Sequence, residues 1–291
     1  MLISQRLERM AASYDDARRT VSRYLLEHPR AVETQSMEQV AQATFTSKAT
    51  LVRVAKQLGF GGWTDFSRQY IIELERERAR STDVDHSLPF GEGASTSQII
   101  ASVADLRAAA AYETGQLQDP AEVDRAVSMV VGAGRVGLFG FGMNEAYLRN
   151  FLTRLLKIGM TATLSTSGGP YVARMLGPGD CAVMVSYTGE SAERDPMCYL
   201  PALREQGVRV VGITCEGENY LRANSDAVLS VLGRERLYNK IGSFSSGESI
   251  SCVLDILYAG IFARAYERNL AYRSQAARSI EGNRQPDAMG Q

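Results

Sequence analysis

The fold is decided by residues 180–191, which read Asp-Cys-Ala-Val-Met-Val-Ser-Tyr-Thr-Gly-Glu-Ser. Residues 181–185 are apolar and partly β-branched, which predicts a short buried strand. The hydroxyl residues and glycine that follow predict a turn, and a helix is expected from about 193 to 206. Together these elements favour a phosphate site, because hydroxyls and the free N–H groups of a helix N-terminus bind anions. An ordinary strand-to-helix turn has the same composition, so both interpretations stay open at this point.

Around this stretch, apolar strand patterns alternate with helical patterns from residue 119 onward. The expected strands are residues 135–139, 161–164, 182–185, 208–213 and 227–232, with a long closing helix at about 247–268. This alternation predicts an α/β doubly wound domain with a parallel sheet covered on both faces. Ligands of such sheets bind at the carboxyl ends of the strands. We therefore expect the ligand crevice beside residues 186–191.

Two further glycine-bearing loops follow predicted strands. Residues 140–144 read Gly-Phe-Gly-Met-Asn, but Glu145 stands where a dinucleotide fingerprint requires its third glycine. This segment is therefore predicted to be a wall for a small ligand rather than a nucleotide-binding loop. Residues 164–169 again place hydroxyls and glycines after a strand, and an ordinary loop explains them equally well.

The first 77 residues are predicted to be entirely helical. Residues 36–43 and 47–58 form a helix pair, with Ser36 and Ser47 as N-caps and Gly59 as the stop signal. The three residues between them, Thr44 to Thr46, match the short joint of a helix-turn-helix.

The second helix of this pair has two different faces. Leu51, Val54, Ala55 and Leu58 repeat at helical spacing and predict a core stripe. The polar side chains outside that stripe have the composition of a DNA-recognition helix, which needs base-edge readers and cations for phosphates. A helical bundle with a solvated cationic face is the alternative. The candidate DNA-binding residues are Lys48, Thr50, Arg53 and Lys56.

The expected domain organisation follows from these patterns. Residues 1–80 form the helix-turn-helix domain and residues 81–97, which contain Pro89, Gly91 and Gly93, form a linker. Residues 98–275 form the α/β domain, beginning with a long helix at about 98–118. Residues 276–291 are polar and are predicted to be a disordered tail.

Composition restricts the function classes. The net charge is −1, but residues 1–80 carry +3 and the remainder −4, which suggests an anionic partner for the N-terminal part. The four cysteines show no metal-binding spacing, and Cys181 and Cys215 lie in apolar runs typical of buried free thiols. No apolar run approaches a membrane span and no signal-peptide pattern is present. A cytoplasmic protein without membrane partners is expected.

The histidines argue against catalysis. Only His28 and His86 occur, and neither lies in the predicted α/β domain. A Ser-His-Asp triad or a histidine-driven opening of a sugar ring is therefore excluded there. We expect no catalytic residue, no metal site and no cofactor.

Two motifs together identify a family resemblance. Residues 47–53, Ser-Lys-Ala-Thr-Leu-Val-Arg, with 58–62, Leu-Gly-Phe-Gly-Gly, resemble the signature of RpiR-type bacterial transcription regulators. Residues 186–191 resemble the S-x-S-G-x-T/S phosphate loop of the sugar isomerase (SIS) domain that follows the helix-turn-helix in that family. The resemblance covers roughly residues 5–270. It implies a flavodoxin-like SIS domain that binds phosphorylated sugars.

The chain departs from that family pattern at two places. Asn144 stands near the position of a ligand-holding Ser or Thr, and Tyr187 and Thr188 replace smaller residues or Ser. Asn144 and Thr188 still carry hydrogen-bond donors. The ligand-binding residues implied are Gly140, Gly142, Asn144, Ser186, Tyr187, Thr188, Gly189 and Ser191.

The expected function is a DNA-binding transcription regulator whose operator affinity is modulated by a phosphorylated sugar or related metabolite. The expected partners are a double-stranded DNA operator, the sugar effector and further copies of the chain in a homodimer or homotetramer. Two alternatives remain: a phosphosugar isomerase or lyase with a helical appendage, or a regulator whose SIS domain serves only oligomerisation.

Overall fold

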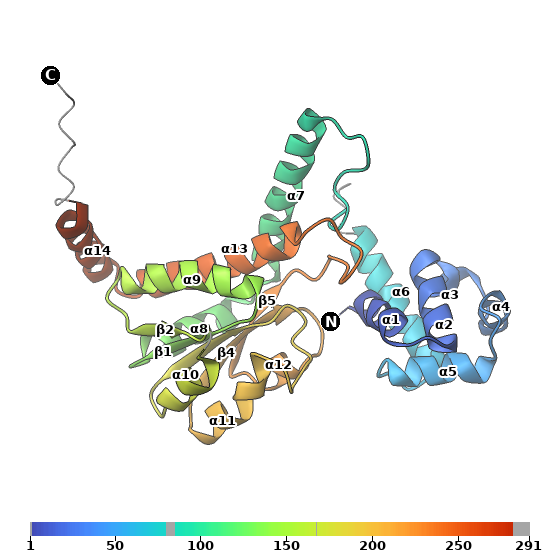
Figure 1. Cartoon of the computed structure of the whole chain (residues 1–291), viewed down its shortest axis with the longest axis horizontal. Coiled ribbons are helices and arrows are strands. Elements are labelled where there is room, and N and C mark those ends of the chain that lie inside the picture. The colour runs from blue at the N-terminus through green and yellow to red at the C-terminus, as the bar shows by residue number, and fades with distance from the viewer. Residues whose placement is uncertain (1, 80–84, 167, 282–291) are drawn as a thin grey trace. The chain divides into compact units, whose positions relative to one another are not determined.

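The computed structural model describes residues 2–79, 85–166 and 168–281 (Figure 1). They fall into two compact units. The first consists of residues up to Ala109 together with Gly233–Ser245, and the second of Ala110–Leu232 together with the chain from Ser246 onward. The chain therefore passes from one unit to the other three times.

The first unit begins with six helices. They are α1 (Ile3–Ser13), α2 (Ala17–Glu27), α3 (Ala31–Thr34), α4 (Met37–Ala43), α5 (Lys48–Gln57) and α6 (Trp63–Ala79). The predicted all-helical N-terminal part is confirmed, and the structure adds α1 and α3, which the sequence analysis did not identify. Asp16 caps α2 by accepting a hydrogen bond from the Arg18 N–H. Ser36 and Gln39 form a reciprocal capping box at the start of α4.

The core of these helices is apolar and rich in aromatic rings. Leu7, Leu25, Leu51 and Phe66 are fully buried. Tyr70 packs beside Phe66 with ring centroids 5.7 Å apart. Each helix contributes to this one cluster, so the orientation of α5 is fixed by hydrophobic burial along its whole inner face.

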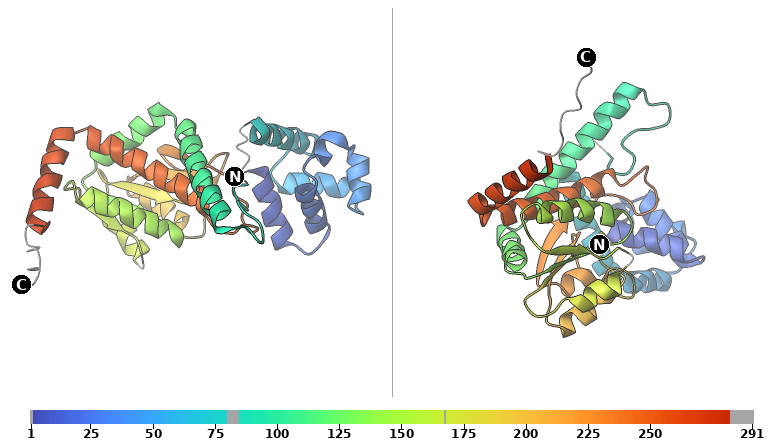
Figure 2. Two further views of the ribbon diagram at one scale, coloured as in Figure 1. Left: turned by 90° about the horizontal axis from the view of Figure 1, so that it is seen from above. Right: turned by 60° about the vertical axis from the view of Figure 1, so that its left-hand side comes forward.

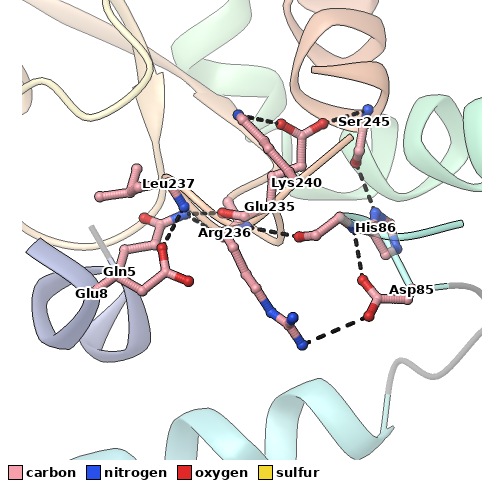
Figure 3. A network of polar contacts seen from close by, with 11 residues as sticks. Gln5, Glu8, Asp85, His86, Glu235, Arg236, Leu237, Lys240 and Ser245 are labelled. Atoms are coloured by element: carbon pink, nitrogen blue, oxygen red, sulfur yellow. Dashed lines mark hydrogen bonds and ion pairs between the residues drawn. The ribbon is translucent and has the colours of Figure 1, made fainter. Parts of the chain in front are cut away.

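Residues 233–245 also belong to the first unit, although they are distant in sequence from its helices (Figure 3). Gln5 of α1 donates hydrogen bonds to the carbonyl oxygens of Gly233 and Glu235, at 3.0 and 2.8 Å. Glu8, also on α1, accepts a hydrogen bond from the backbone N–H of Leu237. Glu235 is buried, and its carboxylate accepts from Lys240 at 2.8 Å and from the Ser245 N–H at 2.6 Å. The segment 233–245 is therefore held to α1 by buried polar contacts.

The second unit contains a five-stranded sheet. Its strands are β1 (Val136–Phe139), β2 (Ala162–Leu164), β3 (Cys181–Val185), β4 (Arg209–Cys215) and β5 (Ala227–Val231). All pair in parallel in the order β2-β1-β3-β4-β5. The predicted doubly wound parallel sheet is confirmed.

Helices cover both faces of this sheet (Figures 1 and 2). The covering helices are α8 (Pro120–Val131), α9 (Met143–Leu156), α10 (Gly169–Met175), α11 (Leu200–Glu205), α12 (Tyr220–Ala223) and α13 (Phe244–Ala263). The unit also contains the end of α7 (Thr96–Leu117), which begins in the first unit, and α14 (Tyr266–Glu281). Alternate residues of β3 point to opposite faces. Val183 and Val185 pack with α8, α9 and α13. Ala182 and Met184 pack with α10, α11 and α12.

Three predicted elements differ from the structure. The helix expected from about 193 to 206 begins only with a 3₁₀ turn at Met197–Tyr199 and continues as α11. Pro196 lacks a backbone N–H and disfavours helix at the residue before it, which explains the late start. The expected closing helix is two helices, α13 and α14. Helix α14 also extends through Glu281, into the segment expected to be a tail, and residues 282–291 lie outside the described part.

Helix α13 is long and apolar enough, by length and composition alone, to cross a membrane. Its residues Ile250, Val253, Leu257 and Ile261 are nevertheless buried in the core beside the sheet. The composition of α13 is therefore that of a core helix. Within the expected linker, residues 81–84 lie outside the described part, and α7 begins at Thr96.

His86 provides a pH-sensitive contact in the first unit. Its Nε2 accepts a hydrogen bond from Arg234 at 3.2 Å, so Nδ1 carries the proton and donates to Ser245 Oγ at 2.7 Å. Burial, with a smaller contribution from the positive charge of Arg234, lowers the pKa of His86 to about 4. Glu235 and Asp85 also face the ring and act in the opposite direction.

We predict that the free energy of unfolding decreases as the pH falls from about 6.5 towards 4. In that window the unfolded chain binds a proton at residue 86 that the folded chain does not, so the slope reaches at most about 1.4 kcal/mol per pH unit. Urea denaturation of the wild type and of His86→Gln between pH 7 and pH 4 measures it. Equal slopes for the two proteins would contradict the prediction.

Candidate DNA-binding and effector sites

Helices α4 and α5 form a tightly closed turn. The Thr46 N–H donates to the Ala41 carbonyl at 2.8 Å and the Phe45 N–H to that of Gln42 at 3.1 Å. These two bonds define a Schellman motif at the end of α4, with Phe45 in the left-handed conformation at φ 52°. The buried Thr44 hydroxyl donates to the Val40 carbonyl at 2.8 Å. For a residue other than glycine, the left-handed conformation costs about 1–2 kcal/mol.

Helix α5 buries the predicted stripe. Leu51 and Ala55 are fully buried and Val54 is nearly so. Ser47 caps the helix by accepting from the Thr50 N–H at 3.2 Å. The stripe is set by the 3.6-residue period and the cap by local hydrogen bonding, so both were visible in the sequence.

The four candidate DNA-binding residues lie outside that stripe. Lys48, Arg53 and Lys56 are exposed, while Thr50 is half-buried. Lys48 Nζ pairs with the Glu38 carboxylate of α4 at 2.9 Å, and the Arg53 guanidinium donates to the Thr50 hydroxyl at 3.2 Å. Both contacts are at the surface, where an ion pair contributes little stability and exchanges readily for another anion. The structure thus presents these side chains on a single helix, available to an external partner.

In the second unit, strand order decides where a ligand fits. Strand β1 pairs with β2 on one side and β3 on the other. The chain leaves β1 towards β2 and leaves β3 towards β4, so the connections diverge at the β1–β3 boundary. Doubly wound sheets bind ligands at such a switch point, outside the carboxyl ends of the strands. Residues 140–144 and 186–191 are the two loops that meet there.

The loop after β1 is short and leads directly into α9. Gly140 is buried, and a Cβ there would lie 2.7 Å from Leu148 Cδ1. Gly142 adopts φ 60° and forms the N-cap of α9, which has no side-chain cap. Asn144, in the first turn, places its amide nitrogen 3.5 Å from the Val185 carbonyl oxygen of β3. The side chain of Asn144 thus bridges the two loops.

The loop after β3 is fixed by backbone contacts. Ser186 Oγ accepts from the Gly189 N–H at 3.2 Å, so this bond does not use the hydroxyl proton of Ser186. The Tyr187 carbonyl accepts from the Cys215 N–H at 2.9 Å, and the Gly189 carbonyl accepts from the Leu221 N–H at 2.9 Å. Tyr187, Thr188 and Ser191 are half-buried.

Gly189 is the position in this loop that tolerates no side chain. It adopts φ 64°, and a Cβ would lie 2.3 Å from Asn219 Oδ1 and 2.5 Å from Thr214 Oγ1. The sequence analysis missed Thr214 and Asn219, which shape the loop from β4 and from the N-cap of α12. A polar residue near the end of β4 and a polar helix cap shortly after it were the signals that could have identified them.

One part of the predicted phosphate site is wrong. The helix after residues 186–191 was expected to supply its N-terminus, but helical structure begins at Met197 and α11 at Leu200. The helix N-terminus that directly follows a glycine loop at this edge is instead that of α9. In the third glycine loop, Ser165 is buried and Thr166 exposed, while residue 167 lies outside the described part.

Strands β3 and β4 each contain a cysteine, Cys181 and Cys215. The thiols of Cys181 and Cys215 are buried, and burial raises the pKa of Cys181 to about 12. Both cysteines are therefore inert, as expected for buried free thiols. Among the residues that the structure describes, no three His, Cys, Asp or Glu side chains gather as metal ligands would.

Comparison with known proteins assigns a family to the N-terminal helices. Residues 1–77 match the model of the helix-turn-helix domain of the rpiR family. The N-terminal region is a helix-turn-helix domain of the rpiR family. The resemblance to RpiR-type regulators drawn from residues 47–62 is confirmed.

The similarity extends over the rest of the chain. The HTH-type transcriptional regulator HexR of Pseudomonas aeruginosa is 26% identical over 227 residues, which cover 75% of this chain and 76% of HexR. The NanR protein of Vibrio vulnificus, solved in complex with ManNAc-6P, superposes with a TM-score of 0.60 at 22% identity and covers 98% of this chain and 100% of its own. The sugar isomerase domain of an RpiR transcription factor from Sphaerobacter thermophilus matches 62% of this chain and 99% of its own, with a TM-score of 0.55 at 24% identity. The second unit therefore has the SIS-like fold.

We predict that Gly189→Ala lowers the free energy of unfolding by more than about 2 kcal/mol. The strained φ accounts for about 1–2 kcal/mol, and the collision with Asn219 and Thr214 adds to it. Gly179→Ala is the matched control, because Gly179 has φ 86° and a Cβ there meets nothing within 4 Å. Urea unfolding measures both variants. If they lose equal stability, the close contact does not constrain the loop.

Proposed function

We propose that this chain is a transcription regulator whose rpiR-family domain binds a DNA operator and whose SIS-like unit binds a phosphorylated sugar that modulates this binding. The observation that carries the proposal is the presence in one chain of a recognition helix with exposed cations and a sheet whose switch point lies between two glycine loops. NanR, which shares the fold, was solved with a sugar phosphate.

The DNA-binding role rests on α5. Its inner face is buried, so its outer face is rigid, and rigidity is needed for base readout. Arg53 is suited to a bidentate contact with a guanine edge, and Lys56 to a phosphate. Lys48 exchanges its surface partner Glu38 for a DNA phosphate or base edge. Thr50 lies one turn before Arg53 and positions the guanidinium through its hydroxyl.

The effector role rests on neutral donors. Residues 186–191 contain no cation. A phosphate there is held by the hydroxyls of Ser186, Thr188 and Ser191, by loop N–H groups, and by the Asn144 amide beside the N-terminus of α9. Tyr187 packs against the core next to the loop. On the opposite side a Cβ at Gly142 would meet nothing within 4 Å, so this position leaves room, whereas Gly140 allows the close approach of Leu148. Such a site favours the phosphorylated sugar over the free sugar.

The segment 233–245 offers a route between the two functions. It follows directly on β5 of the SIS-like unit, yet it belongs to the helix-turn-helix unit and is bonded to Gln5 and Glu8 of α1. Effector binding that shifts this segment changes the position or order of the DNA-binding helices.

Other features of the proposal rest on the class of protein. A regulator of this kind acts in the cytoplasm. It binds DNA as a homodimer or homotetramer, because one helix-turn-helix offers few contacts. The relatives are named transcriptional regulators and the α/β part lacks histidine, so we propose that the chain is not an enzyme. Turnover of sugar phosphates by the purified protein would establish the rival isomerase or lyase function.

We predict that Arg53→Ala weakens operator binding by about 1–3 kcal/mol while the melting temperature is unchanged. The operator fragment is selected from random-sequence duplexes, and a gel-shift titration measures the affinity. Arg68→Ala is the control, since Arg68 is exposed on α6, outside the α4–α5 pair. Equal affinities for wild type and Arg53→Ala would show that α5 is not the reading helix.

We predict that Ser186→Ala combined with Ser191→Ala abolishes the binding of sugar phosphates but leaves operator affinity without effector intact. Both hydroxyls are needed because the loop has no cation to compensate for their loss. Calorimetry with a panel of sugar phosphates measures it. In the wild type, an effector at 100 times its dissociation constant should add about 2.7 kcal/mol of stability.

Ser128→Ala is the matched control for that double variant. Ser128 is exposed on α8, and its hydroxyl donates only to the Asp124 carbonyl one turn earlier. A free sugar that binds the wild type as tightly as its phosphate ester would exclude this loop as the phosphate site. A wild type that binds no sugar phosphate would favour the alternative in which the SIS-like unit serves oligomerisation alone.

A further inference from the structure

Phe45 combines two features that each carry a free-energy cost. Its backbone is left-handed at φ 52°, and among the described residues it is the only one other than glycine with a positive φ. Its side chain is 97% exposed. A large aromatic ring gains nothing from the protein core in that position, and a residue with less strain, such as glycine or asparagine, would close the same turn.

The turn itself does not require the ring. The Schellman bonds use backbone atoms of Ala41, Gln42, Phe45 and Thr46, and the buried side chain that closes the joint is Thr44. Backbone strain of this kind persists only where the surrounding structure holds it, and strained residues cluster at functional sites. The ring of Phe45 is therefore best explained by a partner that covers it.

The position of Phe45 in the chain indicates which class of molecule covers its ring. It lies two residues before Ser47, the N-cap of α5, and three before Lys48. In a helix-turn-helix the N-terminal end of the second helix enters the major groove. Residues immediately before that end lie beside the groove wall. The exposed residues that flank Phe45 in the chain are Gln42, Ala43, Ser47, Lys48 and Ala49. They include a cation, a hydroxyl and an amide but no acidic side chain, which suits a DNA backbone.

We propose that Phe45 is a DNA-contacting residue whose ring packs against an apolar carbon surface of the operator. Duplex DNA offers two such surfaces beside the groove, the C5 methyl group of thymine and the face of a deoxyribose. A phenylalanine ring recognises either through carbon contacts alone. This inference rests on the proposed operator binding and adds a residue outside the helix that reads the bases.

Three variants separate the ring from the backbone. Phe45→Ala removes the ring and keeps the strain of a Cβ at positive φ. Phe45→Asn removes the ring and relieves strain, because asparagine tolerates the left-handed region. Phe45→Leu keeps an apolar side chain. We expect both Ala and Asn variants to bind the selected operator roughly tenfold more weakly, a contact of about 1.4 kcal/mol. Phe45→Leu should retain most of the affinity.

Thermal unfolding is the second readout on the same proteins. Phe45→Asn should melt at a higher temperature than Phe45→Ala, by roughly 4 °C, because its backbone is less strained. Affinity and stability then change independently: the Ala and Asn variants share the affinity loss and differ in melting temperature. If affinity instead followed melting temperature across the three variants, the ring would have only a structural role and the proposal would be overturned.

Operator duplexes with single thymine-to-uracil changes distinguish the two DNA surfaces. A thymine contact predicts one position at which uracil weakens wild-type binding but leaves Phe45→Ala unaffected. A deoxyribose contact predicts that no uracil position is coupled to residue 45, with the tenfold loss present on every duplex. Both results support a DNA contact and assign its source.

The salt dependence of operator binding distinguishes Phe45, which is uncharged, from the charged residue Lys56. Loss of Lys56 should reduce the slope of log affinity against log salt by about 1, whereas loss of Phe45 should leave the slope unchanged. Wild-type affinity retained in both Phe45→Ala and Phe45→Asn overturns the inference while the operator binding of the wild type still stands. A wild type that selects no duplex would refute the proposed function itself.

Discussion

The parallel pairing of β1 with β3 is the interaction on which the effector half of this protein depends. Val136–Phe139 pairs with Cys181–Met184 residue by residue, which brings the ends of two strands that lie 45 residues apart in the chain to the same edge. The two glycine loops follow directly from those strand ends. Any shift in that register would separate Asn144 from Val185 and disperse the donors of the proposed phosphate site.

The pairing of β3 with its other neighbour, β4, fixes the loop that follows β3. The Tyr187 carbonyl is bonded to the N–H of Cys215, the last residue of β4, and the Gly189 carbonyl to that of Leu221 in α12. Gly189 approaches Thr214 and Asn219 so closely that only glycine is accommodated. The loop is therefore preorganised before any ligand arrives, and a preorganised site loses little binding energy to ordering.

The helix-turn-helix half uses a different principle. Its recognition helix is positioned by one buried stripe that packs against an aromatic core. The side chains of α5 outside that stripe are available for contact with a partner. The turn before it contains the strained, exposed Phe45, a local exception in a unit whose caps and packing otherwise agree with sequence preferences. Such exceptions are expected at functional sites rather than in the supporting core.

The sequence alone determined the features that arise from local physics. The period of Leu51, Val54 and Ala55 fixed the buried face of α5, the caps Ser36 and Ser47 fixed helix starts, and the alternation of strands and helices fixed the parallel sheet. The other features were decided by the tertiary structure, because they depend on contacts between residues far apart in the chain. The shaping of the 186–191 loop by Thr214 and Asn219 and the binding of residues 233–245 by Gln5 and Glu8 are both of this kind. No local pattern encodes such contacts, because neither residue of a pair has a distinctive sequence environment before the fold brings the two together.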